Sequence, residues 1–549
     1  MSALFERHRA LLTDAVAAVK AREFWSAFPE MPSGKIYGET ARVEAEAEFE
    51  ALTGQPFDLP GHPETTRLGE EVSPFGPALG ITYPAATPEA LIAASRSAVP
   101  ALAQASVEAR VGALIEALVR LNRMSFLIAH ATQHTTGQAF AMAFQAGGPH
   151  AQDRALEAIA LAFDEMTRFT SRALWEKPQG KAPPLVLEKH WMLRPVGLAL
   201  TIGCNTFPTW NSYPGLFASL ATGNPVIVKP HPAAILPLAL SVRVLRTVFA
   251  ENGLPAEAIV LAVDAPGAEI TRELAGDPAV KLIDYTGSNS FGTWLRDHAT
   301  QARIFTEEAG VNSVILAATD DFAGLCANLA FSLALYSGQM CTAPQNIYVP
   351  EGGIATDQGH KSFDEVATGL AAAVDALLSD PARASGVCGA IANSATLDRV
   401  EAARSLGRVV RESTTLGSGR TASPLILALT RDDPAAQSEC FGPIAFVVPT
   451  RDAREAIARA SDLARSRGAI TAALYDTDEA RITDAIHSFA DAGVNLSINL
   501  TGNIFVNQSA AFSDFHVTGI NPAGNASLTD PAFITPRFHR TMWRRQIRP

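Results

Sequence analysis

From residue 196 onward, short apolar segments alternate with longer segments of helical character. The apolar segments, each expected to form a strand, are VGLALTIG (196–203), the run ending in VIVKP (226–230), 258–263, VKLIDYTGS (280–288), NSVILAATD (312–320) and NIYVP (346–350). Helices are expected between the first of these strands, at about 212–222 and at 236–250. Such alternation is typical of parallel sheets with helices on both faces. The sequence therefore predicts an α/β protein with a doubly wound sheet.

The N-terminal part has a different, purely helical pattern. Residues 3–20 place apolar side chains at helical spacing, and residues 39–52 are rich in the helix formers Glu and Ala. A segment rich in Pro and Gly, GQPFDLPGHP (54–63), separates this part from the rest. Because 549 residues exceed what one hydrophobic core holds, we expect two or three core-bearing units.

Charge and cysteine content exclude several classes of protein. The formal net charge of −12 argues against a nucleic-acid-binding protein or one that binds anionic membranes. The five cysteines are widely spaced and form neither a CxxC pair nor a metal-ligand pattern, which indicates free thiols in a reducing compartment. The sequence contains no signal peptide and no apolar run of the about 18 residues that a membrane helix needs. We expect a cytoplasmic protein.

Four short segments carry side chains suited to chemistry, although each alone is more often structural than functional. No GxGxxG dinucleotide fingerprint follows a predicted strand. Gly287 and Ser288 stand between a strand and a helix, where backbone N–H groups can receive a phosphate. Cys341 lies in a polar loop that favours an accessible thiol, and Glu307 and Glu439 precede small residues that leave room for water beside a general base.

Taken together, in order and spacing, these segments resemble the aldehyde dehydrogenase superfamily over about residues 75–545. The matching blocks are TIGCNTFPTWNSYPGLFASLATGNPVIVKP (201–230), YTGSNSFG (285–292), TEEAG (306–310), SGQMCTAPQN (337–346), ECFGP (439–443) and AFSDFHVTG (511–519). The resemblance implies the aldehyde dehydrogenase fold, whose parts would be a helical extension (1–55), an NAD(P)-binding domain (56–175 and 195–308), a catalytic domain (309–517) and a β oligomerisation element (176–194 and 518–549). It also implies a homodimer or homotetramer.

The resemblance further implies a role for each matching residue. Cys341 would be the nucleophile, Asn205 would stabilise the oxyanion with its amide, and Glu307 would be the general base. The cofactor-binding residues implied are Lys229 and Glu439 at the ribose hydroxyls, Phe441 at the nicotinamide ribose, Gly287 and Ser288 at the pyrophosphate, and Phe207 and Gly310. The implied reaction is oxidation of an aldehyde to an acid through a thioester on Cys341, without a metal.

Three departures from the family pattern affect these expectations. Glu308 and Ala309 replace the middle residues of the usual ELGG block. Ser513-Asp514 and His516 replace the usual paired glycines and lysine, which alters the substrate funnel; Asp514 is either a substrate contact or a solvated acid. His231-Pro232 stand where NAD-preferring members carry a Glu that binds the ribose 2′-OH. Without that charge, NADP would be accepted, either as well as NAD or in preference to it.

Within the superfamily, the chain resembles the PaaN-type enzymes of bacterial phenylacetate degradation, including its SDFHVTGINPAGN segment (513–525). This resemblance implies an open-chain semialdehyde as substrate, either free or linked to coenzyme A as a thioester. The C-terminal segment RFHRTMWRRQIRP (537–549) carries five arginines, which would either contact coenzyme A phosphates or lie on a solvated strand of the oligomerisation element. Two other functions stay open: an acylating dehydrogenase that passes the acyl group to free coenzyme A, and a catalytically silent binding or structural relative.

Overall fold

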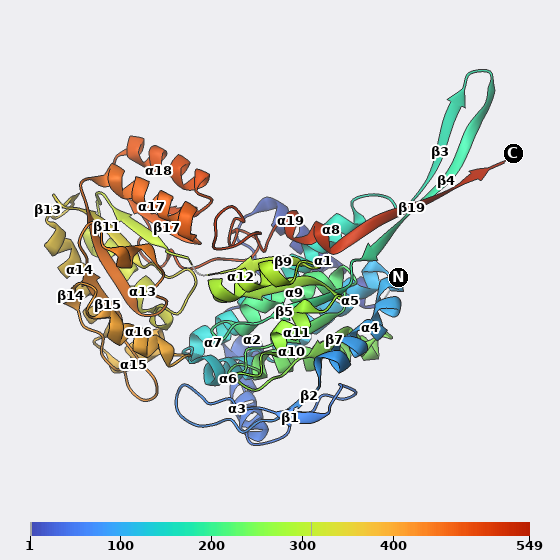
Figure 1. The fold of residues 1–549 in the computed structure, drawn as a ribbon, viewed down its shortest axis with the longest axis horizontal. Coiled ribbons are helices and arrows are strands. Elements are labelled where there is room, and N and C mark those ends of the chain that lie inside the picture. The colour runs from blue at the N-terminus through green and yellow to red at the C-terminus, as the bar shows by residue number, and fades with distance from the viewer. Residues whose placement is uncertain (1–2, 309, 549) are drawn as a thin grey trace.

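A five-stranded parallel sheet lies at the centre of one lobe of the molecule, in a computed structural model that describes residues 3–308 and 310–548 (Figure 1). Its strands are β5 (Leu198–Ile202), β6 (Val226–Lys229), β7 (Ile259–Leu261), β8 (Val280–Thr286) and β9 (Arg303–Glu307). The order is β7-β6-β5-β8-β9, so the chain runs outward from β5 in one direction and then in the other. The strand order reverses between β5 and β8, where α/β sheets bind ligands at the carboxyl ends of their strands.

Helices cover both faces of this sheet. On one face lie α4 (Pro88–Gln104), α11 (Ile270–Gly276) and α12 (Asn289–His298). The other face packs against α5 (Val107–Arg123), α8 (Pro149–Thr167), α9 (Pro208–Ala221) and α10 (Leu236–Glu251). The same core also includes α1 (Ala3–Ala21), α3 (Ala41–Leu52), α6 (Ser125–Thr136), α7 (Phe140–Gly147) and β2 (Tyr83–Ala85). Beside it lie α2 (Gly34–Tyr37) and β1 (Thr66–Leu68). The predicted α/β fold with a doubly wound sheet is confirmed.

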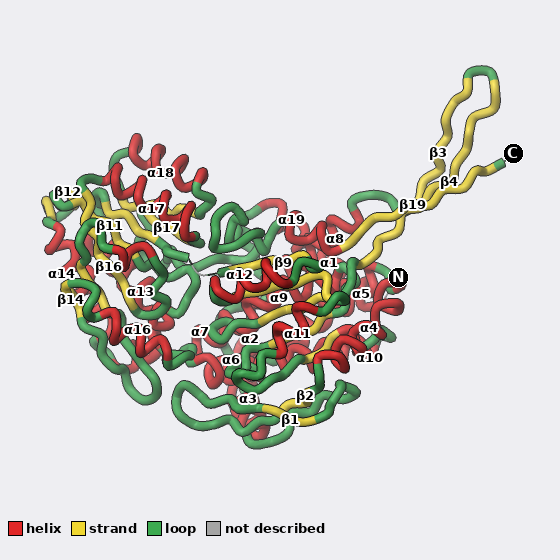
Figure 2. The backbone as a smooth tube through the Cα atoms, in the orientation of Figure 1, coloured by secondary structure: helices red, strands yellow, loops and turns green. Residues whose placement is uncertain are grey.

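The second lobe is built on a seven-stranded sheet of order β14-β15-β16-β11-β10-β17-β18, in which only β14 is antiparallel (Figures 1 and 2). Its strands are β10 (Ser313–Leu316), β11 (Asn346–Pro350), β14 (Arg408–Arg411), β15 (Leu425–Ala428), β16 (Ile444–Thr450), β17 (Thr471–Tyr475) and β18 (Asn495–Ile498), and a small hairpin joins β12 (Ile354–Thr356) to β13 (Gly359–Lys361). One face packs against α13 (Phe322–Ala334) and α14 (Phe363–Leu378), next to α15 (Pro381–Cys388), and the other against α16 (Ala395–Ala403), α17 (Ala453–Arg467) and α18 (Glu479–Asp491).

A three-stranded antiparallel sheet projects from the first lobe as an arm (Figure 1). It has the order β19-β4-β3 and consists of β3 (Arg172–Gln179), β4 (Ala182–Pro195) and β19 (Phe538–Ile547). The arm exposes large apolar side chains, among them Trp175, Met542 and Trp543. Exposed apolar surface of this kind is typical of sites that contact another protein. None of the helices in the described parts of the chain has the length and hydrophobicity to cross a bilayer.

Candidate active site

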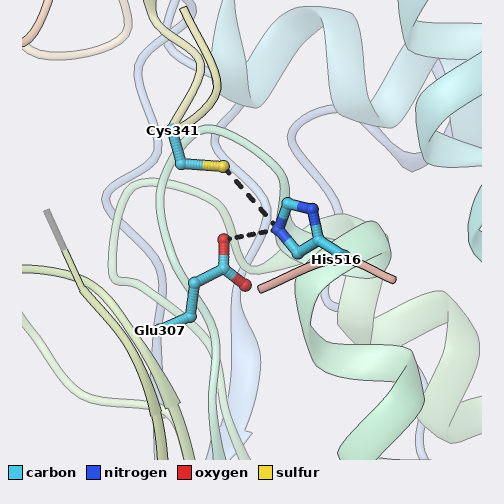
Figure 3. Close-up of side chains that lie close together, drawn as sticks. All are labelled: Glu307, Cys341 and His516. Atoms are coloured by element: carbon cyan, nitrogen blue, oxygen red, sulfur yellow. Dashed lines mark hydrogen bonds and ion pairs between the residues drawn. The ribbon is translucent and has the colours of Figure 1, made fainter. Parts of the chain in front are cut away.

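Three segments that are distant in sequence bring Cys341, Glu307 and His516 together (Figure 3). Glu307 is the last residue of β9 in the first lobe, and Cys341 lies between β11 and the short helix η2 (Leu335–Gly338) of the second lobe. His516 comes from the C-terminal loop, residues 499–530, which lies between β18 and α19 (Pro531–Ile534). One ligand atom from each of the three side chains lies within 4.8 Å of the others.

The His516 imidazole stands between the other two groups. Its Nε2 lies 2.9 Å from Glu307 Oε1 and 4.0 Å from Cys341 Sγ. The other carboxylate oxygen of Glu307 accepts a hydrogen bond of 3.0 Å from the Asn211 amide of α9. Both oxygens of the buried carboxylate are thus held by side chains, which orients it toward the thiol.

The charges of this cluster shift the pKa values of the acid and the thiol in opposite directions. Burial alone would raise the pKa of Glu307, but the positive charge and hydrogen bond of His516 lower that pKa below its ordinary value. Burial, together with the negative charge of Glu307, raises the pKa of Cys341 well above that of an ordinary thiol. In the resting site Glu307 is therefore an ionised carboxylate beside a neutral Cys341 thiol.

The loop that carries Cys341 adopts an unusual backbone conformation. Tyr336, Ser337 and Gly338 all have positive φ, at 51°, 49° and 63°. Tyr336 Oη donates a 2.6 Å hydrogen bond to Thr136 O of the first lobe, and Ser337 Oγ donates to Ala422 O at 2.8 Å. A Cβ on Gly338 would lie 2.4 Å from Gly442 O, so only glycine fits there. Strain held by such contacts is common at functional sites.

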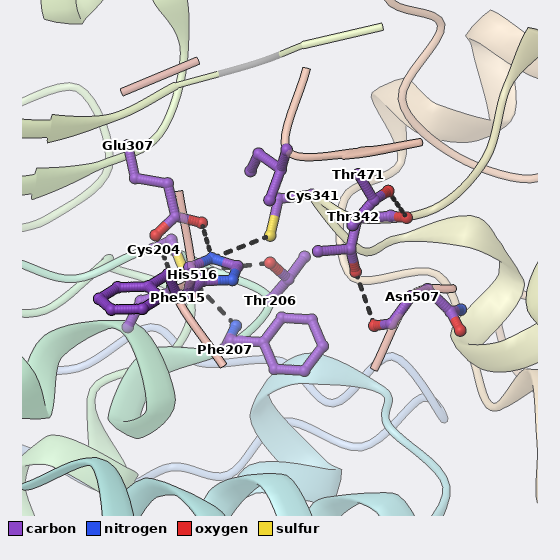
Figure 4. A network of polar contacts seen from close by, with 12 residues as sticks. Cys204, Thr206, Phe207, Glu307, Cys341, Thr342, Thr471, Asn507, Phe515 and His516 are labelled. Carbon is purple, nitrogen blue, oxygen red and sulfur yellow. Dashed lines mark hydrogen bonds and ion pairs between the residues drawn. The ribbon is translucent and has the colours of Figure 1, made fainter. Parts of the chain in front are cut away.

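Beyond Cys341, side chains fix the backbone on both sides of the nucleophile. Asn312 Nδ2 donates to Cys341 O at 2.8 Å and to Ala343 O at 2.9 Å. Thr342 Oγ1 donates to Asn507 O at 2.8 Å, which joins the nucleophile loop to the C-terminal loop (Figure 4). The thiol is thereby held on a rigid support.

Asn205 and Phe207 lie in the turn between β5 and α9. The Asn205 Oδ1 atom is buried and has no hydrogen-bond partner among the described residues. Phe207 N–H donates to Cys204 Sγ at 3.4 Å, and the Phe207 ring packs edge-on against Tyr336 with centroids 5.6 Å apart. The turn thus contacts the nucleophile loop from the first lobe, and Cys204, which the sequence places among structural thiols, lies in the same network (Figure 4).

The carboxyl ends of β5 and β8 form the edge where a dinucleotide would bind. Ser288 caps α12 by accepting a hydrogen bond from Phe291 N, and Gly287 precedes it at the end of β8. A Cβ on Gly287 would lie 2.4 Å from the Tyr285 hydroxyl, so the close turn requires glycine. Because the N-terminus of a helix of ten residues follows, backbone N–H groups are directed at this edge.

Lys229 and Glu439, predicted to act together on the ribose hydroxyls, each have another direct partner in the structure. Lys229 Nζ forms a buried ion pair of 2.7 Å with Asp264 Oδ1. Burial raises the pKa of Glu439 to about 7, and a hydrogen bond from the Gly310 backbone opposes this rise. Phe441, two residues on, is held through its carbonyl by Arg399 at 2.5 Å. These residues lie on the two lobes, at the positions that the sequence assigns to the cofactor.

The model of the Aldehyde dehydrogenase family matches residues 66–527. This chain belongs to the aldehyde dehydrogenase family. Its structure is similar to the crystal structure of an NAD-dependent aldehyde dehydrogenase from Burkholderia multivorans, with 51% identity, a TM-score of 0.98 and coverage of 100% of both chains. The chain is thus an oxidoreductase with the aldehyde dehydrogenase fold, as the sequence predicts.

Curated relatives match the aldehyde dehydrogenase over shorter stretches. Alpha-ketoglutarate semialdehyde dehydrogenase of Haloferax volcanii is 26% identical over 355 residues, which are 62% of this chain and 70% of that protein. 1-pyrroline-5-carboxylate dehydrogenase 2 of Bacillus subtilis is 27% identical over 386 residues, 66% of this chain and 69% of that protein.

Two of the departures from the family pattern have structural explanations in this aldehyde dehydrogenase. Glu308 is buried and forms an ion pair with Arg296 of α12, directly over Gly292, where a Cβ would collide with the carboxylate. Asp514 is exposed, and its Oδ2 accepts a 2.7 Å hydrogen bond from Ala510 N. Asp514 therefore closes a turn of the C-terminal loop, which favours a structural acid over a substrate contact.

The third departure concerns the neighbour of Lys229. Burial, reinforced by the positive charge of Lys229, lowers the pKa of His231 to about 4, so the imidazole is neutral near pH 7. His231 Nδ1 accepts a hydrogen bond from Ala233 N at 3.1 Å, which leaves the proton on Nε2. In this aldehyde dehydrogenase His231 is thus a neutral donor.

Sequence reasoning missed several residues of this site. Asn211 stands one helical turn after Phe207, and Asp264 follows β7, the strand that pairs with β6, so both could have been found from predicted elements. The sequence marks His516 only as a replacement that alters the substrate funnel. Trp210, whose ring lies edge-on to His516 with centroids 4.7 Å apart, carries no signal in the sequence beyond its size.

Proposed function

We propose that this enzyme oxidises an aldehyde to a carboxylic acid with NAD or NADP, through a thioester on Cys341 that water hydrolyses. The observation that carries the proposal is the contact of one charged, buried carboxylate, Glu307, with both the thiol and an imidazole. A thiol supplies the nucleophile, and a carboxylate beside it supplies the base that hydrolysis needs.

The residues present fit a dinucleotide. The glycine turn at Gly287 and the N-terminus of α12 suit a pyrophosphate, and the Lys229 ammonium lies buried at the end of the adjacent strand β6. Glu439 and Phe441 approach from the second lobe. When bound, the nicotinamide supplies the hydride acceptor for aldehyde oxidation.

The residues of the chain account for the remaining steps. Glu307 accepts the proton of Cys341, and the resulting thiolate adds to the aldehyde carbonyl. The Asn205 amide stabilises the oxyanion that forms on the former carbonyl oxygen. After the hydride has left, Glu307, its proton released, takes a proton from water as the water oxygen attacks the thioester and the sulfur leaves as a thiolate. His516 keeps Glu307 ionised for both steps.

We further propose a semialdehyde as the substrate, in bacterial degradation of phenylacetate or a related aromatic compound. The support is the resemblance of the segment SDFHVTGINPAGN to the PaaN-type enzymes, and the relative named as an alpha-ketoglutarate semialdehyde dehydrogenase. Two forms of the substrate are open under this proposal, the free acid and the coenzyme A thioester.

The tail arginines give little support for contacts with coenzyme A phosphates. Arg537 is fully buried and makes two hydrogen bonds to Asp284, at 2.6 and 2.9 Å. Arg545 pairs with Glu188 across strands β19 and β4 of the arm. We propose instead that the arm joins subunits into a homodimer or homotetramer in the cytoplasm.

Both cofactors are proposed to serve, since the neutral His231 repels neither. kcat/KM for NAD is then expected to exceed kcat/KM for NADP by no more than about tenfold, which corresponds to ~1.4 kcal/mol. A larger preference for NAD contradicts this part of the proposal.

The test of the function is the formation of reduced nicotinamide from a panel of aldehydes, with and without free coenzyme A. Hydrolytic oxidation predicts turnover without coenzyme A, and no turnover by Cys341→Ala. Turnover that depends on added coenzyme A would identify an acylating enzyme, and nucleotide binding without turnover would identify a silent relative.

A further inference from the structure

Arg154 on α8 is a buried cation without a hydrogen-bond acceptor. Its side chain is 1% exposed, and none of its three guanidinium nitrogens has a partner among the described residues. Other buried arginines differ: Arg110 donates to backbone carbonyls, and Arg537 donates to Asp284. A buried charge whose hydrogen bonds are unmade is strongly unfavourable, so the guanidinium keeps its donors available for an anionic group.

A chain of contacts links Arg154 to the active site. The Arg154 guanidinium lies 4.0 Å over the Trp210 ring, and that ring meets His516 edge-on, with centroids 4.7 Å apart. His516 in turn contacts Glu307 and Cys341. After Glu157, Glu307 and the ionisable thiol of Cys341 have the largest charge effects on Arg154, so the guanidinium lies within electrostatic range of the reacting groups.

Two further acids, Glu157 and Asp514, act on Arg154 by charge without a hydrogen bond to it. Glu157, one turn along α8, has the largest charge effect of the acids on Arg154, but its Oε1 pairs with Arg22 at 3.3 Å and its buried Oε2 has no hydrogen-bond partner among the described residues. Burial raises the pKa of Glu157 to about 7, so it is only partly ionised near pH 7. Asp514 is exposed and accepts the backbone N–H of Ala510. Neither acid accepts a hydrogen bond from Arg154.

We propose that Arg154 binds the carboxylate of an ω-oxo acid whose aldehyde group reaches Cys341. This inference rests on the proposed function and selects among its substrates. A guanidinium and a carboxylate match in charge and in paired hydrogen-bond geometry. A thioester carbonyl is neutral and does not satisfy a buried cation, so the free semialdehyde is the substrate rather than its coenzyme A thioester.

The first test compares matched substrates. Succinic, glutaric and adipic semialdehydes are assayed against butanal, pentanal and hexanal, and one semialdehyde is also supplied as its coenzyme A thioester. The best semialdehyde is expected to exceed its neutral partner and its thioester in kcat/KM. Arg154→Met should reduce that preference by about 10- to 100-fold, the range for losing hydrogen bonds between charged groups, while activity on neutral aldehydes persists. An equal loss on charged and neutral aldehydes would overturn the inference, because it would mean that Arg154 acts only on the thiol.

The second test does not depend on turnover. Binding of glutarate is measured by calorimetry, and Arg154→Met should weaken it by about tenfold or more. Arg243→Gln is the matched control, since Arg243 also lies over an aromatic ring, Phe57, but away from the site. Arg154→Met removes a buried charge without hydrogen bonds and keeps an apolar side chain against Trp210. The Tm of this variant should therefore be higher than that of the unmutated enzyme. A lower Tm, or unchanged glutarate binding, would show a structural arginine and overturn the inference. If the unmutated enzyme binds glutarate through Arg154 but oxidises no aldehyde, that result would refute the proposed function alone.

Discussion

The imidazole of His516 holds the carboxylate of Glu307 at 2.9 Å, although the two residues are 209 positions apart in the chain. This contact keeps a fully buried acid ionised, since its pKa lies below the ordinary value in spite of burial. A base that is ionised before the substrate arrives can act on both the thiol and the water. The site therefore depends on a residue that the family pattern does not provide.

Replacing His516 with Gln should move the acid limb of the pH–rate profile to higher pH. Without His516 the pKa of Glu307 rises, so the carboxylate is protonated, and the activity lost, at a higher pH than in the unmutated enzyme. We also expect kcat to fall by about 10²-fold. The measurement is kcat against pH for H516Q, with H539Q on the exposed strand β19 as control. A fall in kcat with an unshifted limb would mean that His516 only packs the site.

Replacing Glu307 with Gln should make Cys341 more reactive toward alkylation at a given pH. The negative charge of Glu307 raises the pKa of the thiol, so its removal lowers that pKa and increases the thiolate fraction. The rate of iodoacetamide labelling of Cys341 against pH measures the shift. A midpoint that moves upward in E307Q would be inconsistent with the charge distribution described above.

Zinc ions should inhibit the enzyme reversibly. Cys341, Glu307 and His516 offer sulfur, oxygen and nitrogen ligands within 4.8 Å of one another, the ligand types that Zn²⁺ binds. Inhibition is expected to disappear on adding a chelator and to weaken in H516Q. Equal zinc sensitivity in H516Q would place the inhibitory ion elsewhere.

The ion pair of Arg537 with Asp284 should be essential for stability. Arg537 is fully buried, so Asp284→Ala leaves an unpaired charge in the core and should cost about 3–5 kcal/mol. The exposed pair of Arg545 with Glu188 is the contrast, and R545Q should cost less than about 1 kcal/mol. Urea unfolding of both variants measures the difference. A loss of unfolding free energy in D284A as small as that in R545Q would indicate that the core tolerates Arg537 without its partner.

The fold class could be predicted because its signal is local. Strands such as 280–286 and helices such as α10 are marked by apolar spacing and by the residues at their ends. The blocks around Cys341 and Glu307 follow the order of the family pattern, so the sequence alone assigns both residues to one site.

The place of His516 could not be predicted in this way. The C-terminal loop has almost no regular structure, and its non-glycine residues Phe512 and Val517 have positive φ, which propensity does not anticipate. Contacts from the N-terminus determine its course: Arg22 donates to Thr529 O at 2.9 Å, and Trp25 packs edge-on against Phe512. Such long-range contacts form only when the chain folds, and no local pattern of residues encodes them.

The central claim, that oxidation proceeds through a thioester on Cys341 resolved by Glu307, is tested most directly by trapping the acyl group. E307Q is mixed with aldehyde and NAD or NADP, digested, and analysed by mass spectrometry. Because loss of the Glu307 charge lowers the pKa of Cys341, E307Q can form the thiolate without this base but cannot activate water. The account predicts one equivalent of reduced nicotinamide per site and an acyl group on the peptide that contains Cys341, which hydroxylamine releases. Continued turnover without an acylated Cys341, or acylation of another residue, would contradict it.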